Sequence, residues 1–433
     1  MAEYTDREAF IPYRKADVIE LCVQDGKLNK EDTQKFREFC EIVGAYYHFD
    51  FHENLEALKD SFAPYDPDSD TKSLVEPTPE QLQENQKKLV EELTHVLERA
   101  NYSKLTEEQK ERALTEKSLI TLDMDVNFDD FEECVLYHRG CEQETVELKK
   151  FFGLKKVPFT MDIFRRVVLL LKFKDEDYFL KKFKGNKKKV DALNFTPGKM
   201  YIYLYKNIPQ ADLEMLFPNV EISMTLKDKL FLGVPAIGAG VPVLLKILPN
   251  LLIILGIIGA VMAGREIQRG EVMGTIIAAL SGLVVVGGFI FKQYVKFKNK
   301  RIKFLKNVSD TLFFKNLVSN AGVFNSLIDA AEDEECKEVF LAYYHLLTSD
   351  KPLTREELDD KIEEWLEEKF HTHIDFDVDK ALEKMKALTG KLEDGQEATI
   401  LTINPDKTCK LLGIDDSKTV IDYIWDNIFQ YNV

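Results

Sequence analysis

Apolar and polar residues over the first 60 positions follow the period of an α-helix. Four prolines between positions 61 and 79 then interrupt regular structure, and a leucine stripe restarts the helical pattern at position 80. We therefore expect a helical N-terminal region, 1–117, with a proline-rich linker near 61–79. The apolar residues that carry the helical period are Val18, Ile19, Cys22, Val23, Phe36, Phe39, Cys40, Val43, Leu82, Leu89, Leu93 and Leu97.

The period changes near position 118, where runs rich in Val, Ile, Phe and Tyr have the length of strands. Because these strands are neighbours in sequence, we expect an α+β domain, 118–229, with mostly antiparallel pairing. The lysine-rich run KKFKGNKKK, with Gly185 and Asn186 at its middle, predicts a hairpin loop. Contact with lipid headgroups or a phosphate ligand is its functional interpretation, and an exposed turn made soluble by charge is the favoured one.

Two long apolar segments at 230–291 predict a transmembrane hairpin. The second, 272–291, holds 20 residues without a charge, enough to cross a hydrocarbon core. The first contains Pro235, Pro242 and Pro249, and it is either one kinked span or a re-entrant piece followed by a short span.

Small residues recur at every fourth position of both segments, which favours close helix packing within the hairpin. An oligomeric pore or transporter element built from the same stripes is the alternative. The expected packing residues are Gly256, Ala260, Gly264, Gly274, Ala278 and Gly282.

A run of seven basic residues without an acid follows the second segment, in a basic exit segment and connecting helix expected over 292–331. By the positive-inside rule it places both termini on the cytoplasmic face of a bacterial-type inner membrane, or of the mitochondrial inner membrane if the protein is organellar. Anionic lipid headgroups are then the expected partners of the run, rather than nucleic acid. The expected contacts are Lys292, Lys296, Lys298, Lys300, Arg301 and Lys303.

Three helical patterns followed by two short strand-like runs over 332–433 give the order of a winged-helix-like domain. The domain is acidic, with 26 Asp and Glu against 12 Lys and Arg, in a chain of net charge -17. This charge argues against a grip on a nucleic-acid backbone, so we expect a protein partner or a homo-oligomer.

Signatures of catalysis and metal binding are sparse. The chain has no P-loop, G-x-S-x-G, H-E-x-x-H or G-x-G-x-x-G motif, its six cysteines include no C-x-x-C pair, and we expect no metal and no cofactor. His48 and His52 have the spacing of two zinc ligands, but a surface or packing pair is favoured. The acidic pairs that follow position 328 are expected on the surface or in salt bridges between helices.

If the chain is an enzyme, the polar residues to test lie in the α+β domain. Asp212 and Glu214 are carboxylates in a short helical stretch between two prolines, and Arg139 and Arg166 are nearby basic residues in strand-like runs. A helix dipole alone would explain a carboxylate at position 212. The sequence leaves catalysis open and favours a non-catalytic role.

Several stretches together resemble the transmembrane protein 143-like family, a family of unknown function found in bacteria and organelles. The resemblance implies a two-pass membrane protein with soluble domains on one side, and it supplies no catalytic residues. The stretches that carry it are FIPYRKAD, APYDPDSD, YHRG, RRVVLLLKFK, NIPQADLEMLFP, KNLVSNAG and DAAEDEECKEVFLAYY.

Taken together, these patterns predict an α+β membrane protein: a helical N-terminal region, a small mostly antiparallel α+β domain, a two-helix transmembrane hairpin and a C-terminal winged-helix-like domain. The function that they favour is a membrane-anchored interaction or regulatory protein. A membrane-proximal enzyme or lipid-binding protein is the first alternative, and an oligomeric pore or transporter element is the second.

Overall fold

The computed structural model describes residues 8–105, 122–150, 155–224, 313–371 and 373–429, together with isolated positions between 249 and 306. Contacts divide the chain into two compact units. The first unit is formed by the described residues of Met1–Lys110, Asp129–Gln210 and Asn316–Val433, and the second by those of Glu111–Phe128 and Ala211–Lys315. Each unit is treated by itself below.

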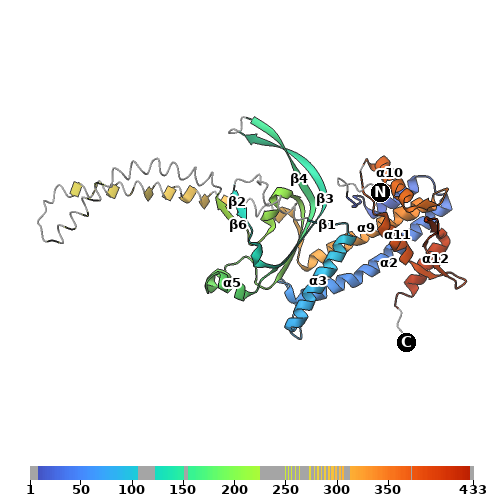
Figure 1. The fold of residues 1–433 in the computed structure, drawn as a ribbon, viewed down its shortest axis with the longest axis horizontal. Coiled ribbons are helices and arrows are strands. Elements are labelled where there is room, and N and C mark those ends of the chain that lie inside the picture. Colours follow the sequence, from blue (N-terminus) through green and yellow to red (C-terminus); the bar gives the residue numbers. More distant parts are fainter. Residues whose placement is uncertain are drawn as a thin grey trace. The chain divides into compact units, whose positions relative to one another are not determined.

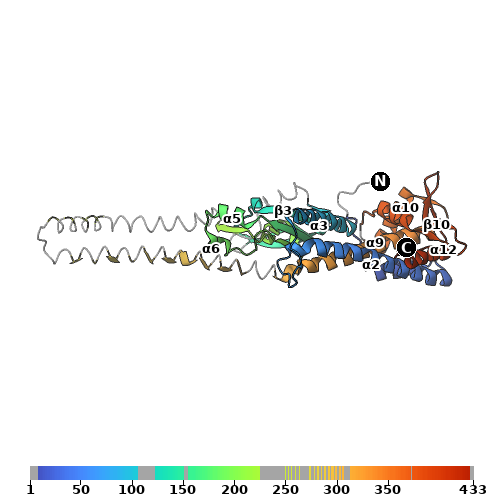
Figure 2. The same cartoon turned by 90° about the horizontal axis from the view of Figure 1, so that it is seen from below.

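One long helix, α9, is the centre of the first unit. Three helices of the N-terminal region pack against it, and Figure 2 shows two of them, α2 and α3, running beside α9. Its residues are buried along most of its length, because α10 and α11 also pack against it. The helices are α1 (Lys15–Gln24), α2 (Lys30–Phe62), α3 (Pro79–Arg99), α9 (Ala321–Leu347), α10 (Arg355–Phe370), α11 (Val378–Ala387) and α12 (Ile414–Asp426).

Capping residues explain where several of these helices begin. Asn29 accepts a hydrogen bond from a backbone amide in the first turn of α2. Thr78 begins α3, and Thr354 begins α10, each in a capping box in which side chain and backbone satisfy each other. Local sequence therefore determines these N-termini.

A five-stranded antiparallel sheet, in the order β1-β3-β4-β5-β7, completes the first unit (Figure 1). The register places Tyr137, Val168 and Leu204 side by side on neighbouring strands, and these residues belong to the same core as the helices. The strands are β1 (Ser103–Lys104), β3 (Phe131–Lys150), β4 (Lys155–Phe173), β5 (Met200–Pro209) and β7 (Asn316–Ser319).

Strand β4 is buried on both faces at its inner end. Residues 167–171 are each at most 1% exposed, so neighbouring residues that point to opposite faces are both covered. This explains why the stretch is continuously apolar instead of alternating. The antiparallel pairing predicted for this region is confirmed in every strand pair of the described residues.

The last hundred residues alternate helices with short strands. Strand β8 (Leu353–Thr354) lies between α9 and α10 and pairs with β12 (Thr408–Leu411), which also pairs with β11 (Leu401–Ile403). A separate pair is formed by β9 (Thr389–Lys391) and β10 (Glu397–Thr399), and α12 packs on both α2 and β9. This region thus shares its core with the N-terminal helices.

The second unit holds an antiparallel pair, β2 (Leu122–Asp125) and β6 (Glu221–Met224). Most of the 3₁₀ helix η3 (Gln210–Leu216) belongs to it as well. The Phe128 and Phe217 rings meet edge to face, with centroids 5.4 Å apart. Asn219 donates a hydrogen bond of 2.8 Å to the carbonyl oxygen of Asn127.

The prediction of a transmembrane hairpin needs correction. Residues 230–291 lie outside the described part of the chain except for isolated positions. Among the helices that the structure describes, none has both the length and the apolar character needed to cross a membrane. An apolar run of sufficient length is a necessary condition for a span and not a sufficient one. Within the described residues the fold class is α+β, and the expected multi-pass location in an inner membrane is withdrawn.

The prediction of a hairpin loop at KKFKGNKKK is also wrong. Two short helices, α5 (Glu176–Lys182) and α6 (Lys187–Val190), occupy this stretch between β4 and β5. Asp175 begins α5 by accepting a hydrogen bond from the backbone amide of Tyr178. The helix cap at Asp175 therefore determines the local structure before the Gly185–Asn186 turn is reached.

Candidate functional site

The two carboxylates proposed from sequence as catalytic, Asp212 and Glu214, lie on η3 in the second unit. Glu214 is partly buried, and this burial, followed by the nearby charge of Asp125, raises the pKa of its carboxyl group to about 7. The two arginines proposed with them lie in the first unit. The structure therefore brings Glu214 close to Asp125, a residue that sequence reasoning did not single out.

Arg139 and Arg166 are cross-strand partners on β3 and β4. Arg139 donates a hydrogen bond of 2.9 Å to the carbonyl oxygen of Ala100, and its guanidinium lies 4.1 Å from the centre of the Phe10 ring. Arg166 donates to the carbonyl oxygen of Arg165 at 2.9 Å. These contacts give Arg139 a packing role between the sheet and the N-terminal segment.

The lysines and small residues proposed for membrane contact lie largely outside the described residues. Lys292, Lys296, Lys298 and Lys303 are described and exposed, and Lys300 and Arg301 are not described. Among the small residues only Gly274 is described, and a Cβ added there would meet nothing within 4 Å. The packing proposed for Gly256, Ala260, Gly264, Ala278 and Gly282 stays a prediction.

Helix α9 carries a cluster of buried charged side chains. Glu334 and Lys337 form an ion pair at 2.5 Å and are each no more than 2% exposed. The backbone amide of Ile11 donates to Glu334 at 3.1 Å, and Lys337 donates to the carbonyl oxygens of Ile11 and Tyr13. Burial raises the pKa of the Glu334 carboxyl group. The pair therefore fixes the N-terminal segment onto α9.

Two further glutamates of α9 hold the neighbouring helices. Glu335 pairs with Arg99 of α3 at 2.5 Å, and Arg99 also contacts Asp50 of α2 at 2.9 Å. Glu338 pairs with Lys384 of α11 at 2.6 Å. Sequence reasoning expected interhelix salt bridges or surface positions here, and for these two glutamates the salt bridges are found.

Helix α11 occupies the place of the recognition helix in a winged-helix order, and two of its three lysines contact other residues of the protein. Lys384 is bound to Glu338, as above, and Lys380 donates a hydrogen bond of 3.0 Å to Asn101 at the end of α3. Lys380 also pairs with Asp377 at 3.1 Å. These two lysines are therefore engaged within the protein and are not available to phosphates.

His48 and His52 lie one turn apart on α2, and both are exposed, in keeping with the surface pair that was favoured from sequence. His48 Nδ1 lies 2.8 Å from Glu332 Oε2, and Lys15 contacts the other oxygen of the same carboxylate at 2.9 Å. His52 is exposed. Across the described residues, no group of three or more His, Cys, Asp or Glu side chains could hold a metal ion.

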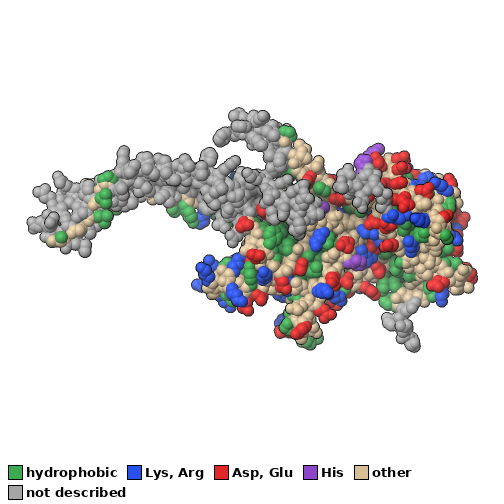
Figure 3. Space-filling view, in the orientation of Figure 1, with side chains coloured by type: hydrophobic (Ala, Val, Ile, Leu, Met, Phe, Trp, Pro, Cys, Tyr) green, Lys and Arg blue, Asp and Glu red, His purple; other side chains and the backbone are tan. Residues whose placement is uncertain are grey.

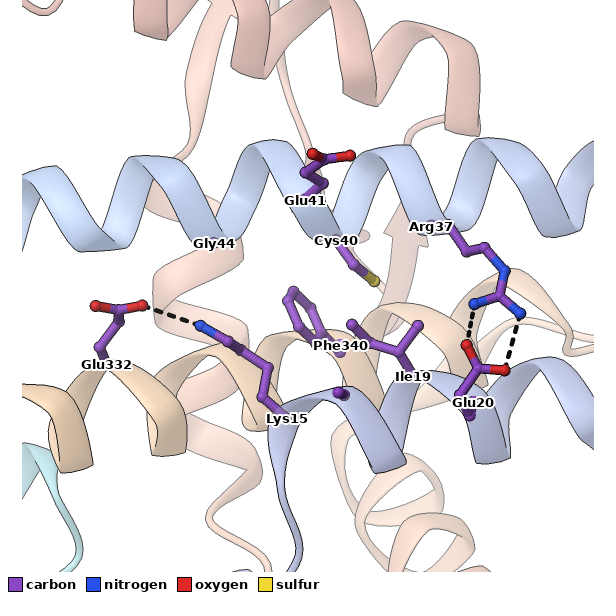
Figure 4. Close-up of a pocket in the computed structure, with 10 residues that line it drawn as sticks. Lys15, Ile19, Glu20, Arg37, Cys40, Glu41, Gly44, Glu332 and Phe340 are labelled. Atoms are coloured by element: carbon purple, nitrogen blue, oxygen red, sulfur yellow. Dashed lines mark hydrogen bonds and ion pairs between the residues drawn. The ribbon is translucent and has the colours of Figure 1, made fainter.

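A cavity of about 390 Å³ lies among α1, α2 and α9, next to this carboxylate (Figure 4). Its floor is apolar, with Ile19 and Phe340 at the centre, and ion pairs close both ends. One pair joins Lys15 to Glu332, and the other joins Arg37 to Glu20. Four of the charged side chains that line the cavity are thus paired with each other, and Glu41 of α2 also lines it.

Three aromatic side chains form an exposed cluster where α12 meets α2. We call Phe49, Trp425 and Phe429 the aromatic patch. The Phe49 ring packs edge-on against Trp425 and Phe429, with centroid distances of 6.3 and 5.0 Å. Trp425 is 41% exposed and Phe429 is 62% exposed.

Carboxylates surround the aromatic patch. Asp422 and Asp426 lie three residues before and one after Trp425 on α12, and Glu53 lies one helical turn after Phe49 on α2. All three are exposed, and none has an ion-pair partner among the residues described. Figure 3 shows acidic side chains over α10 and α12 and lysines gathered over α5. The aromatic patch therefore lies in a negatively charged surface.

In the sequence, Phe49 lies in the aromatic run YYHFDF and Trp425 lies near the C-terminus, and the sequence pattern does not connect them. The two positions are 376 residues apart, so no local pattern could join them. The sequence offered one local signal, a tryptophan with aspartates near it on an amphipathic helix. Tryptophan is usually buried, so one with acidic neighbours is a candidate for an exposed binding residue.

Comparison with known proteins adds one match to this α+β fold. A family model described as "Protein of unknown function (DUF3754)" matches residues 164–322, which is less than half of the chain. The matched stretch includes the end of β4, all of β5 and the start of α9. No solved structure matches the chain. These comparisons name no activity, and the resemblance to the transmembrane protein 143-like family stays a prediction.

Proposed function

We propose that this chain is an interaction protein whose aromatic patch binds a basic, amphipathic segment of a partner protein. The observation that carries the proposal is the exposed Phe49–Trp425–Phe429 cluster with unpaired carboxylates beside it. Tryptophan is enriched among residues that dominate binding energy, and exposed apolar clusters mark interaction sites. The surrounding carboxylates favour a partner with lysines or arginines.

A protein partner agrees better with the described contacts than nucleic acid does. Two of the three α11 lysines, Lys380 and Lys384, are bound to Glu338, Asp377 and Asn101 instead of being free to contact phosphates. The region 332–433 also has a large excess of acids, which would repel a phosphate backbone. Both facts support recognition of a cationic protein surface.

Binding can be measured with a defined probe, a synthetic amphipathic helix with lysines on one face and leucines on the other. The chain has two tryptophans, of which Trp365 is 6% exposed and Trp425 is 41% exposed. A change in tryptophan fluorescence on adding the peptide therefore reports on Trp425. We expect saturable binding that weakens with added salt, because screening reduces attraction between exposed charges.

The variant Trp425→Ala tests the site, with affinity measured by calorimetry. We expect a loss of about 2 kcal/mol, or roughly thirtyfold in Kd, which is the size expected for a central aromatic contact. Ile403→Ala is the matched control, because Ile403 is also 41% exposed and lies outside the aromatic patch on β11. Equal affinities in the two variants, or equal binding of a peptide with glutamates in place of lysines, would refute the proposal.

A further inference from the structure

The outer halves of β3 and β4 form a two-stranded ribbon that extends past the rest of the sheet (Figure 1). β4 pairs with β5 only as far as Ile163, opposite Pro209, whereas β3 and β4 continue to pair as far as Lys150 and Lys155. On the other side, β1 reaches only His138 of β3. An isolated pair of strands is marginally stable, and a third strand is normally needed.

The two edges of this ribbon differ in their ability to accept another strand. Pro158 lies in the outer half of β4 and has no N–H to donate. The outer half of β3, residues 142–150, has the sequence EQETVELKK, without proline or glycine. Gly140 and Cys141 donate their amides to the Glu8 carboxylate at 2.6 and 2.9 Å, so the open edge begins after them. Proline protects natural sheet edges, and only the β4 edge has one.

We infer that the β3 edge pairs with the same edge of a second copy of this chain, joining two ribbons into a four-stranded antiparallel sheet across a two-fold axis. Charge complementarity supports a second copy as the occupant. When the two-fold axis passes through Val146, antiparallel pairing places position 142, a glutamate of one copy, opposite position 150, a lysine of the other copy. The two-fold symmetry makes this pair occur twice. Position 143, a glutamine, then lies opposite position 149, a lysine.

This inference is independent of the aromatic patch. The ribbon belongs to β3 and β4, whereas the patch belongs to α2 and α12. Binding of the basic peptide should therefore persist in variants that lose self-association. Titration of each ribbon variant with the basic peptide therefore also shows whether that variant is folded.

Complementary charge variants test the inference with the full chain. Glu142→Lys with Glu144→Lys makes the edge strand basic at both ends, and Lys149→Glu with Lys150→Glu makes it acidic at both ends. By light scattering after size-exclusion chromatography over a dilution series, we expect a dimer for the unaltered chain. Each variant alone should dimerise at least tenfold more weakly, and an equimolar mixture of the two should recover the dimer.

Three results would overturn the inference. The first is a monomer for the unaltered chain at every concentration. The second is an unchanged dimer in both variants, which would place self-association elsewhere. The third is a mixture that stays as monomeric as its components, because the charges at the two ends of the strand would then not meet.

Discussion

His345 is fully buried on α9, and neither of its ring nitrogens has a hydrogen-bond partner among the described residues. The rings of Tyr344 and Trp365 meet it edge-on, with centroids 5.1 and 5.2 Å away. Burial, followed by the nearby charges of Lys361 and Lys27, lowers the pKa of this imidazole to about 3. At neutral pH the side chain is a neutral aromatic group of the core.

This burial predicts acid sensitivity. Between the unfolded value of 6.5 and the folded value near 3, the unfolded chain binds a proton that the folded chain does not. Stability therefore falls as the pH falls through this window, and from pH 7 to pH 5 the unaltered chain should lose about 2 kcal/mol more than His345→Leu. Urea unfolding at the two pH values measures the difference. Parallel losses in both proteins would show that His345 is not the source.

At the scale of elements, α9 joins the N-terminal helices to the C-terminal ones through buried ion pairs. Arg99 contacts Glu335 and Asp50 and lies 3.7 Å from the centre of the Phe51 ring. Removing it would leave the buried Glu335 carboxylate with its longer contact to Lys384, at 3.4 Å. Arg99 therefore helps to hold α3 against α2 and α9.

We expect Arg99→Ala to lower the free energy of unfolding by about 3 kcal/mol, because the buried Glu335 carboxylate loses its closest cation and keeps the longer contact with Lys384. Arg14→Ala is the matched control, since Arg14 forms an exposed ion pair with Asp17 within one helical turn. No measurable change is expected there. Chemical denaturation of the two variants gives the comparison, and similar midpoints would contradict the role assigned to Arg99.

Local signals predicted the elements better than their partners. Thr354 and Glu357 have the spacing of a capping box in the sequence, and the capping box is present at the start of α10. The lysine run after Asp175 led to the wrong prediction of a hairpin loop, because a glycine and an asparagine indicate a turn without showing whether strands or helices flank it. The apolar run at 230–291 led to the transmembrane prediction for a different reason, because hydropathy shows only that a segment is apolar enough to lie in a membrane.

The candidate site was less predictable than the fold. The aromatic patch depends on α12 packing against α2, and the buried partners of Glu335 and Glu338 come from α3 and α11. Side chains that look like a solvated helix face in sequence become buried when several helices surround the same axis. The charge count was more informative, because the acidic balance of 332–433 already favoured a protein partner over nucleic acid.

At the scale of the whole molecule, we assign partner recognition to the acidic surface that has the aromatic patch at its centre. A helical core supports this surface, and the buried glutamates of α9 named above are engaged in ion pairs. Hydrogen exchange of the full chain, with and without the lysine–leucine peptide, tests this most directly. We predict that the peptide slows exchange in two stretches, 46–53 of α2 and 420–429 around α12, and leaves the ribbon of β3 and β4 unchanged. Slowed exchange elsewhere, with these two stretches unaffected, would contradict the account.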